Sequence, residues 1–167
     1  MSNIQNLTTQ EQADLISKIE GAVQSVMKNE IDILKNGRVE RNFTAYLRNE
    51  IAERIKMDKI HCDPFYNKHL GATKMLNGKV IELDIAVHER NVDDINLVAI
   101  ELETNNTPTG DDLWKIEGLT QKLGGFGYKL GLYVVFGVSE KAGQIITKKW
   151  FQNGKPLRTQ PNPLLQA

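Results

Sequence analysis

The sequence contains one cysteine, Cys62, among its 167 residues. A single thiol excludes an internal disulfide and any zinc site built from paired cysteines, and it is typical of a reducing compartment. The first twenty residues lack the basic start and apolar run of a signal peptide, and no apolar stretch approaches the roughly 20 residues that span a bilayer. We therefore expect a cytoplasmic protein that does not bind membranes.

The chain also lacks an excess of either charge, because 21 basic residues balance 21 acidic ones. The balance conceals a segregation along the sequence. Residues 1–81 carry 12 bases and 10 acids, residues 82–112 carry 1 base and 9 acids, and residues 113–167 carry 8 bases and 2 acids. A stretch rich in carboxylates beside a basic stretch is what a cation site next to an anion-binding surface needs.

The length and composition predict one domain over residues 1–167. Forty per cent of the residues are apolar and 25% are charged, as in an ordinary globular protein. We divide the chain into an N-terminal helix within 1–37, a core over 38–153 and an irregular, proline-containing tail over 154–167.

Apolar residues at helical spacing predict four helices. A long amphipathic helix is expected over 10–36, a second from about 38 to 56, a third over 113–123 closed by Gly124 and Gly125, and a last one from Ser139 to about 153.

Alternating or continuous apolar runs predict the strands. A short edge strand is expected over 60–64, a loop over 66–78, and longer strands over 79–88, 96–104 and 130–138. The order of elements predicts an α/β domain with a mixed sheet.

Acidic residues interrupt the two central strands at regular intervals. If these strands pair as a hairpin, Asp84, Glu101 and Glu103 project from one face, where clustered carboxylate oxygens suit a Mg²⁺-like cation. A solvated polar face of a hairpin is the alternative. The acids alternate with aliphatic residues rather than with the Lys, Arg and Thr of a wet face, which favours the cation site.

These residues resemble the PD-(D/E)XK phosphodiesterase superfamily, which has the restriction-endonuclease-like fold. Glu101-Leu-Glu103 follows Asp84 by 17 positions and ends an aliphatic run, and Glu40, Asp63-Pro-Phe-Tyr and Asp112-Leu-Trp-Lys115 flank it in the family's order. The resemblance spans roughly residues 38–138. It implies an αβββαβ core, here with an additional N-terminal helix.

The resemblance implies a role for each matching residue. Asp84 and Glu101 would hold Mg²⁺ or Mn²⁺, which polarises the scissile phosphate and activates water, and Glu40 would be the acid that some members carry on the preceding helix. Glu103 occupies the usual lysine position, so it would act as a base or a further metal ligand. Lys115, on the following helix, would replace the missing lysine.

The implied function is a metal-dependent nuclease acting on DNA, with RNA left open. A catalytically inactive module for nucleic-acid binding or assembly is the alternative, since the usual lysine is missing. Lys122, Lys129 and Arg90 are candidate nucleic-acid contacts or simply solvated charges. The helix over 10–36 is a candidate homodimer contact. Trp114 is interpreted as a core aromatic, with base stacking as its alternative.

Overall fold

A six-stranded mixed sheet forms the centre of the molecule in the computed structural model, which describes residues 7–37, 40–69, 71–92, 94–123 and 125–158. The strands lie in the order β1-β6-β7-β8-β9-β10, and only β7 and β8 are parallel neighbours. Their bounds are β1 (Ile60–Tyr66), β6 (Leu83–Glu89), β7 (Asn96–Thr104), β8 (Leu130–Phe136), β9 (Ile145–Gln152) and β10 (Lys155–Pro156). The predicted α/β class with a mixed sheet is confirmed.

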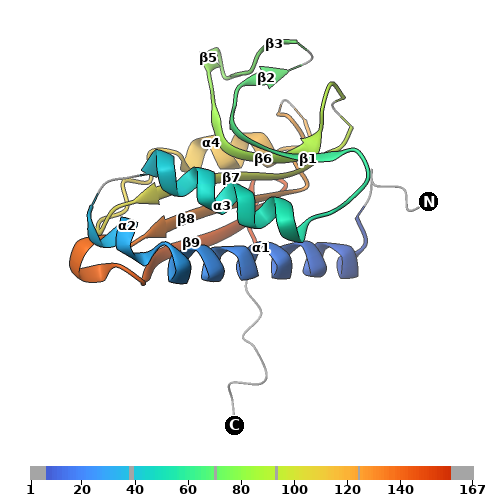
Figure 1. The fold of residues 1–167 in the computed structure, drawn as a ribbon. Helices are drawn as coiled ribbons and strands as arrows, with labels where there is room; N and C mark the ends of the chain where they lie inside the picture. Colours follow the sequence, from blue (N-terminus) through green and yellow to red (C-terminus); the bar gives the residue numbers. More distant parts are fainter. Residues whose placement is uncertain (1–6, 38–39, 70, 93, 124, 159–167) are drawn as a thin grey trace.

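Helices cover both faces of this sheet (Figure 1). One face packs against α1 (Thr9–Asn29), α2 (Ile31–Lys35) and α3 (Glu40–Arg54). The opposite face packs against α4 (Leu113–Thr120), which joins β7 to the parallel strand β8. A parallel pair needs such a crossover, because a tight turn cannot bring the chain back to the same end of the sheet.

The alternation along the strands divides the core into two clusters. Ile100 and Leu132 pack with the helices α1 and α3, whereas Ala99 and Tyr133 pack with α4. All nine residues of β7 are buried, because this strand lies inside the sheet and is covered on both faces. Polar side chains on β7 are therefore withdrawn from bulk water.

The N-terminal helix is shorter than the sequence predicts. A capping box starts it, in which Thr8 Oγ1 accepts the Glu11 N–H at 3.2 Å while the Glu11 carboxylate accepts the Thr8 N–H at 2.7 Å. It ends at Asn29, and Glu30 separates it from α2. Its apolar stripe is buried in the chain's own core. The pattern that suggested a dimer contact is thus explained within one chain, and the homodimer stays a prediction.

The predicted C-terminal helix from Ser139 to about 153 is wrong. Only Ser139–Lys141 form a short 3₁₀ turn, and Gly143 with φ +88° leads into the strand β9. Trp150 and Phe151 enter opposite core clusters, as neighbours in a strand must. The open edge of β8 pairs antiparallel with this segment, so sheet hydrogen bonding overrides its helix-like spacing.

The predicted loop over 66–78 contains short strands instead. β2 (Lys68–His69) pairs with β3 (Ala72–Thr73), and β4 (Met75–Leu76) pairs with β5 (Lys79–Val80). Residues Lys79 and Val80 therefore belong to a separate hairpin rather than to the long strand predicted over 79–88.

Smaller differences concern the boundaries. The edge position of β1 is confirmed, and α3 occupies most of the predicted 38–56 helix, of which residues 38 and 39 lie outside the described part. α4 ends at Thr120, before the expected closure at Gly124, which is also outside the described part. The tail begins with β10, which pairs with β9, so it is not irregular from residue 154.

Among the described residues, no helix is both long enough and apolar enough to cross a membrane.

Candidate active site

Asp84 lies where the strands β6 and β7 stop pairing through their backbones. The regular register ends at Ile85 and Ile100, and the Leu102 N–H donates instead to Asp84 Oδ2 at 2.8 Å. This bond fixes the Asp84 carboxylate beside the middle of β7. Burial raises the pKa of Asp84, against the opposing effect of the Leu102 N–H.

Glu101 is the most deeply buried acid of the site, with 1% of its surface exposed. Burial raises its pKa well above the usual value, and the neighbouring Asp84 carboxylate raises it further. Its Oε2 accepts a bond from Lys115, whereas its Oε1 is buried and has no hydrogen-bond partner among the described residues. A buried, unpartnered carboxylate oxygen needs a proton or a cation.

Lys115, on the first turns of α4, points at the Glu101 carboxylate. Its Nζ lies 2.9 Å from Glu101 Oε2 and 2.9 Å from Asp112 Oδ1, and it donates to the Glu82 carbonyl at 3.4 Å. Burial alone lowers a lysine pKa, but the Glu101 and Asp112 carboxylates raise the pKa of Lys115 above its ordinary value. Lys115 therefore stays protonated at neutral pH, so it is a donor and a positive charge rather than a base.

Glu103 lies on the same face of β7 but belongs to a different network. Its Oε1 accepts the Tyr133 hydroxyl at 2.5 Å and the Thr109 hydroxyl at 2.9 Å, and its Oε2 accepts the Thr109 N–H at 3.0 Å. Although burial opposes ionisation, these donors lower the pKa of Glu103. Glu103 thus anchors the chain between β7 and α4, where Gly110 N–H also donates to the Tyr133 hydroxyl at 3.2 Å.

An acidic groove of about 500 Å³ opens beside these strands. Glu40, at the start of α3, lines it and accepts the Thr104 N–H at 3.3 Å. Burial and then the charge of Asp84 raise the pKa of Glu40. The lining consists of Glu40, Glu103, Thr104, Asn105, Thr109, Asp111 and Asp112. Without cations, so many carboxylates repel a phosphate.

The structure brings Asp84, Glu101, Lys115 and Glu40 to one region, but it does not gather three carboxylates into one cage. No three His, Cys, Asp or Glu side chains within the described ranges form a group that could hold a metal ion. Glu103 is engaged by Tyr133 and Thr109, so the expected metal cluster of Asp84, Glu101 and Glu103 is not present. Mg²⁺ needs less, because it usually keeps several waters and takes one or two carboxylates plus substrate oxygens. Asp84 and the unpartnered Oε1 of Glu101 fit that role.

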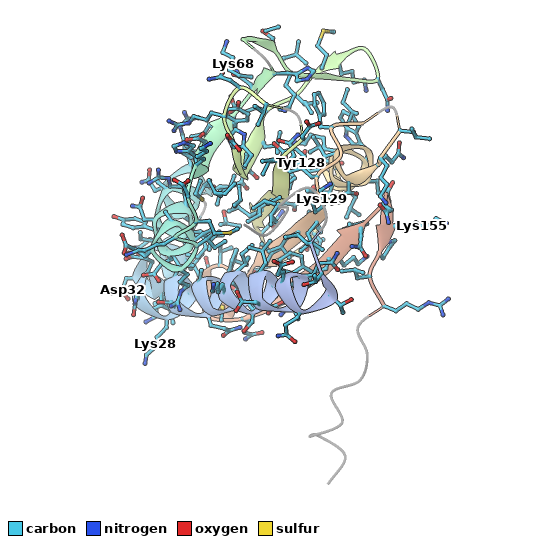
Figure 2. All side chains as sticks on the ribbon, turned by 90° about the vertical axis from the view of Figure 1, so that its right-hand side faces the viewer. Lys28, Asp32, Lys68, Tyr128, Lys129 and Lys155 are labelled. Carbon is cyan, nitrogen blue, oxygen red and sulfur yellow. The ribbon has the colours of Figure 1, made fainter. Side chains whose placement is uncertain are left out.

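The three predicted nucleic-acid residues lie in different settings. Arg90 is ion-paired with Asp63, whose carboxylate also lies 3.0 Å from His88 Nε2. Lys122 is exposed after α4. Lys129 is half-buried just before β8, next to Tyr128 (Figure 2). The Tyr128 N–H donates to the Leu119 carbonyl at the end of α4.

Sequence reasoning missed two residues that shape the site, Tyr133 and Thr109, and it named Asp112 only as part of the family's order, without its contact with Lys115. Asp112 binds Lys115, and Tyr133 and Thr109 hold Glu103. A signal for Tyr133 was available, because it is the one hydroxyl-bearing residue in the aliphatic run of β8. Thr109 gave no comparable signal, since only the tertiary structure brings its loop back to β7.

Comparison with known proteins identifies no relative. No family model, curated protein or solved structure matches the chain.

Proposed function

We propose that this protein is a Mg²⁺- or Mn²⁺-dependent nuclease that hydrolyses phosphodiester bonds of DNA. The observation that carries the proposal is the deeply buried Glu101, whose Oε1 has no partner among the described residues and whose carboxylate lies between Asp84 and Lys115. The unpartnered oxygen supports a cation at this point, and a cation makes an acidic site attractive to phosphate.

The order of elements supports a restriction-endonuclease-like fold for the core of the chain. α3, β1, β6, β7, α4 and β8 follow one another as helix, three strands, helix and strand, with the short strands β2 to β5 inserted after β1. This order matches the αβββαβ core that we propose, and Asp84 and Glu101 lie on its second and third strands. The proposed fold family rests on this order and on the acids, because no solved structure matches.

Asp84, Glu101 and Lys115 each have a defined task in the proposed reaction. A bound divalent cation supplies Lewis-acid polarisation of the phosphate and a lowered pKa of water. Asp84 and Glu101 hold it, with Asp84 oriented by the Leu102 N–H. Lys115 is held at Glu101 and Asp112, and its positive charge stabilises negative charge that develops on phosphate oxygens. The role of base or ligand proposed for Glu103 is weakened, because its oxygens accept three hydrogen bonds.

The direct test incubates the full chain with plasmid, linear duplex and single-stranded DNA and with RNA, each with Mg²⁺ or Mn²⁺. We expect cleavage that requires the metal and that Asp84→Ala or Glu101→Ala lowers by about 100-fold or more. Cleavage that survives both substitutions would place the active site elsewhere. Cleavage of RNA alone would change the proposed substrate.

A catalytically inactive binding or assembly module is the second candidate. It is favoured by the missing third acid in the metal group and by Lys115, which already offsets the charge of Glu101. In that case no metal supports cleavage, and Lys115 serves as a permanent internal counter-ion.

A further inference from the structure

The indole of Trp114 lies partly in solvent beside the proposed active site. Trp114 is 37% exposed and immediately precedes Lys115 on the first turn of α4. Lys115 Nζ contacts Glu101 and also donates to the Glu82 carbonyl at 3.4 Å, so the first turn of α4, which carries Trp114, meets the chain that follows β5 next to Glu101. A large aromatic surface left open next to a reactive centre calls for an explanation.

The hairpin formed by β4 and β5 brings a positive charge to this ring. Leu76 packs on α4 so closely that a Cβ added at Gly118 would lie 2.6 Å from its Cδ2. Lys79 pairs with Leu76 across the hairpin, and its Nζ lies 5.5 Å from the centre of the Trp114 ring. Within the described ranges Lys79 has no carboxylate partner, so its charge is available to a phosphate.

We propose that Trp114 is a stacking platform for an unpaired base of the nucleic-acid strand whose phosphate reaches Asp84 and Glu101, and that Lys79 binds a neighbouring phosphate. The inference rests on the proposed nuclease function and deepens it, because it makes single-stranded or locally unpaired nucleic acid the substrate. The charges support this occupant over an apolar protein segment. A polyanion gains from Lys79 beside the ring, whereas an apolar segment does not.

The sequence offers a direct reporter, since Trp114 and Trp150 are its only tryptophans. Trp150 is 6% exposed, and its Nε1 donates to Glu20 at 2.8 Å, away from α4. The variant Trp150→Phe leaves Trp114 as the sole indole fluorophore. The matched variant Trp114→Phe leaves only Trp150, whose emission should not respond.

The experiment titrates both variants with a single-stranded thymidine oligonucleotide in Ca²⁺, following fluorescence emission and, with a labelled strand, anisotropy. We expect Trp114 emission to fall by about half at saturation, as base stacking on the ring predicts. An abasic strand carrying the same phosphates should bind roughly 5- to 150-fold more weakly and leave the emission unchanged. Trp114→Ala should weaken binding of the thymidine strand to a similar degree, whereas Trp114→Phe keeps a ring and most of the affinity.

Binding without a change in Trp114 emission, wild-type affinity in Trp114→Ala, or no binding at all overturns the stacking platform. The nuclease proposal is judged separately by gel analysis in Mg²⁺. Cleavage without quenching rejects the platform alone, and quenching of a strand that stays intact in every metal rejects the nuclease alone.

Discussion

Lys115 Nζ lies 2.9 Å from Oε2 of Glu101, 14 residues earlier in the chain. The lysine side chain is 15% exposed and the glutamate side chain 1% exposed, so the pair is shielded from bulk water. In such surroundings each charge depends on the other, because removing one partner leaves a buried charge uncompensated. In the proposed nuclease site, Lys115 would replace the lysine that is missing at position 103.

Lys115 is expected to support cleavage without being needed for metal binding. Lys115→Ala should lower the cleavage rate by about 100- to 1,000-fold, the usual cost of removing a donor that stabilises transition-state charge. It should leave Mn²⁺ binding intact or tighter, because it removes a positive charge beside Glu101. Mn²⁺ titration by calorimetry beside a cleavage assay measures the two effects. Lys115→Arg is the matched control that keeps the charge, and loss of metal binding in Lys115→Ala would contradict this role.

The second prediction concerns stabilisation by metal. If Asp84 and Glu101 hold a cation, saturating Mg²⁺ or Mn²⁺ should raise the melting temperature, because a ligand at 100 times its Kd adds about 2.7 kcal/mol to the free energy of unfolding. Glu101→Gln and Asp84→Asn should each abolish this increase. Differential scanning calorimetry with and without the metal checks it. Asp111→Asn, on the groove but outside the pair, should keep most of the increase.

The third prediction concerns the pH dependence of the metal-free protein. The pKa values of Glu101, Asp84 and Glu40 are raised in the folded state, so the folded state holds these protons more tightly than the unfolded one. Stability from these groups is fully present below their ordinary values, 3.8 for Asp and 4.5 for Glu, and is lost as the pH rises through the raised values. Urea unfolding at a series of pH values should therefore show stability falling above pH 4.5.

Glu101→Gln should flatten that decline, since it removes the group whose pKa is raised most clearly. The opposite trend is expected at lower pH. Hydrogen bonds from Arg90 and His88 outweigh burial and lower the pKa of Asp63 to about 2. The pKa of Glu103 is also lowered, by its hydrogen bonds with Tyr133 and Thr109. Stability from these two acids is lost as the pH falls below their ordinary values. An unchanged slope above pH 4.5 in Glu101→Gln would show that ionisation of Glu101 does not cause the decline in stability.

The fourth prediction separates anchoring from catalysis at Glu103. Glu103→Gln and Tyr133→Phe should each cost about 1–3 kcal/mol of stability, because each removes a partner of a buried hydrogen bond. The double variant should cost less than the two together, since both act on one contact. Chemical unfolding of the four proteins gives the coupling. A loss of cleavage in Glu103→Gln by more than tenfold, with the fold retained, would restore Glu103 as a catalytic group.

The fifth prediction concerns the proposed nucleic-acid contacts. Arg90 is paired with Asp63, so Arg90→Ala should lower stability while leaving DNA affinity nearly unchanged. Lys122 is exposed. If it contacts a phosphate, Lys122→Ala should weaken binding equally for all sequences and reduce the slope of log K against log salt by roughly one. Binding isotherms at several salt concentrations distinguish the two residues.

The local pattern of the sequence predicted most of the central sheet. The alternation on β6 and β7, the continuous apolar run of β8 and the proline-bearing edge strand β1 follow from side-chain periodicity, which needs no knowledge of the rest of the fold. The prediction failed at β9, where the helix-like spacing of Ile145, Ile146 and Trp150 was overridden by pairing with β8. Trp114 was also misjudged as a core residue, because a helix pattern does not show which part of its face remains uncovered.

The sequence alone determined which strands carry the acids and which residues alternate along each strand, because strand periodicity is a local property. The pairing register of β6 with β7 then put Asp84 and Glu101 on the same side. Only the tertiary structure decided which of these acids act together. It buries Glu101 between Asp84 and Lys115, and it turns Glu103 toward Tyr133 and Thr109. Burial and hydrogen-bond partners depend on segments far apart in the chain, and they set the charge state of a carboxylate. The single cysteine excluded a disulfide and a paired-cysteine zinc site, and the balanced total charge did not show where the acids and bases would meet.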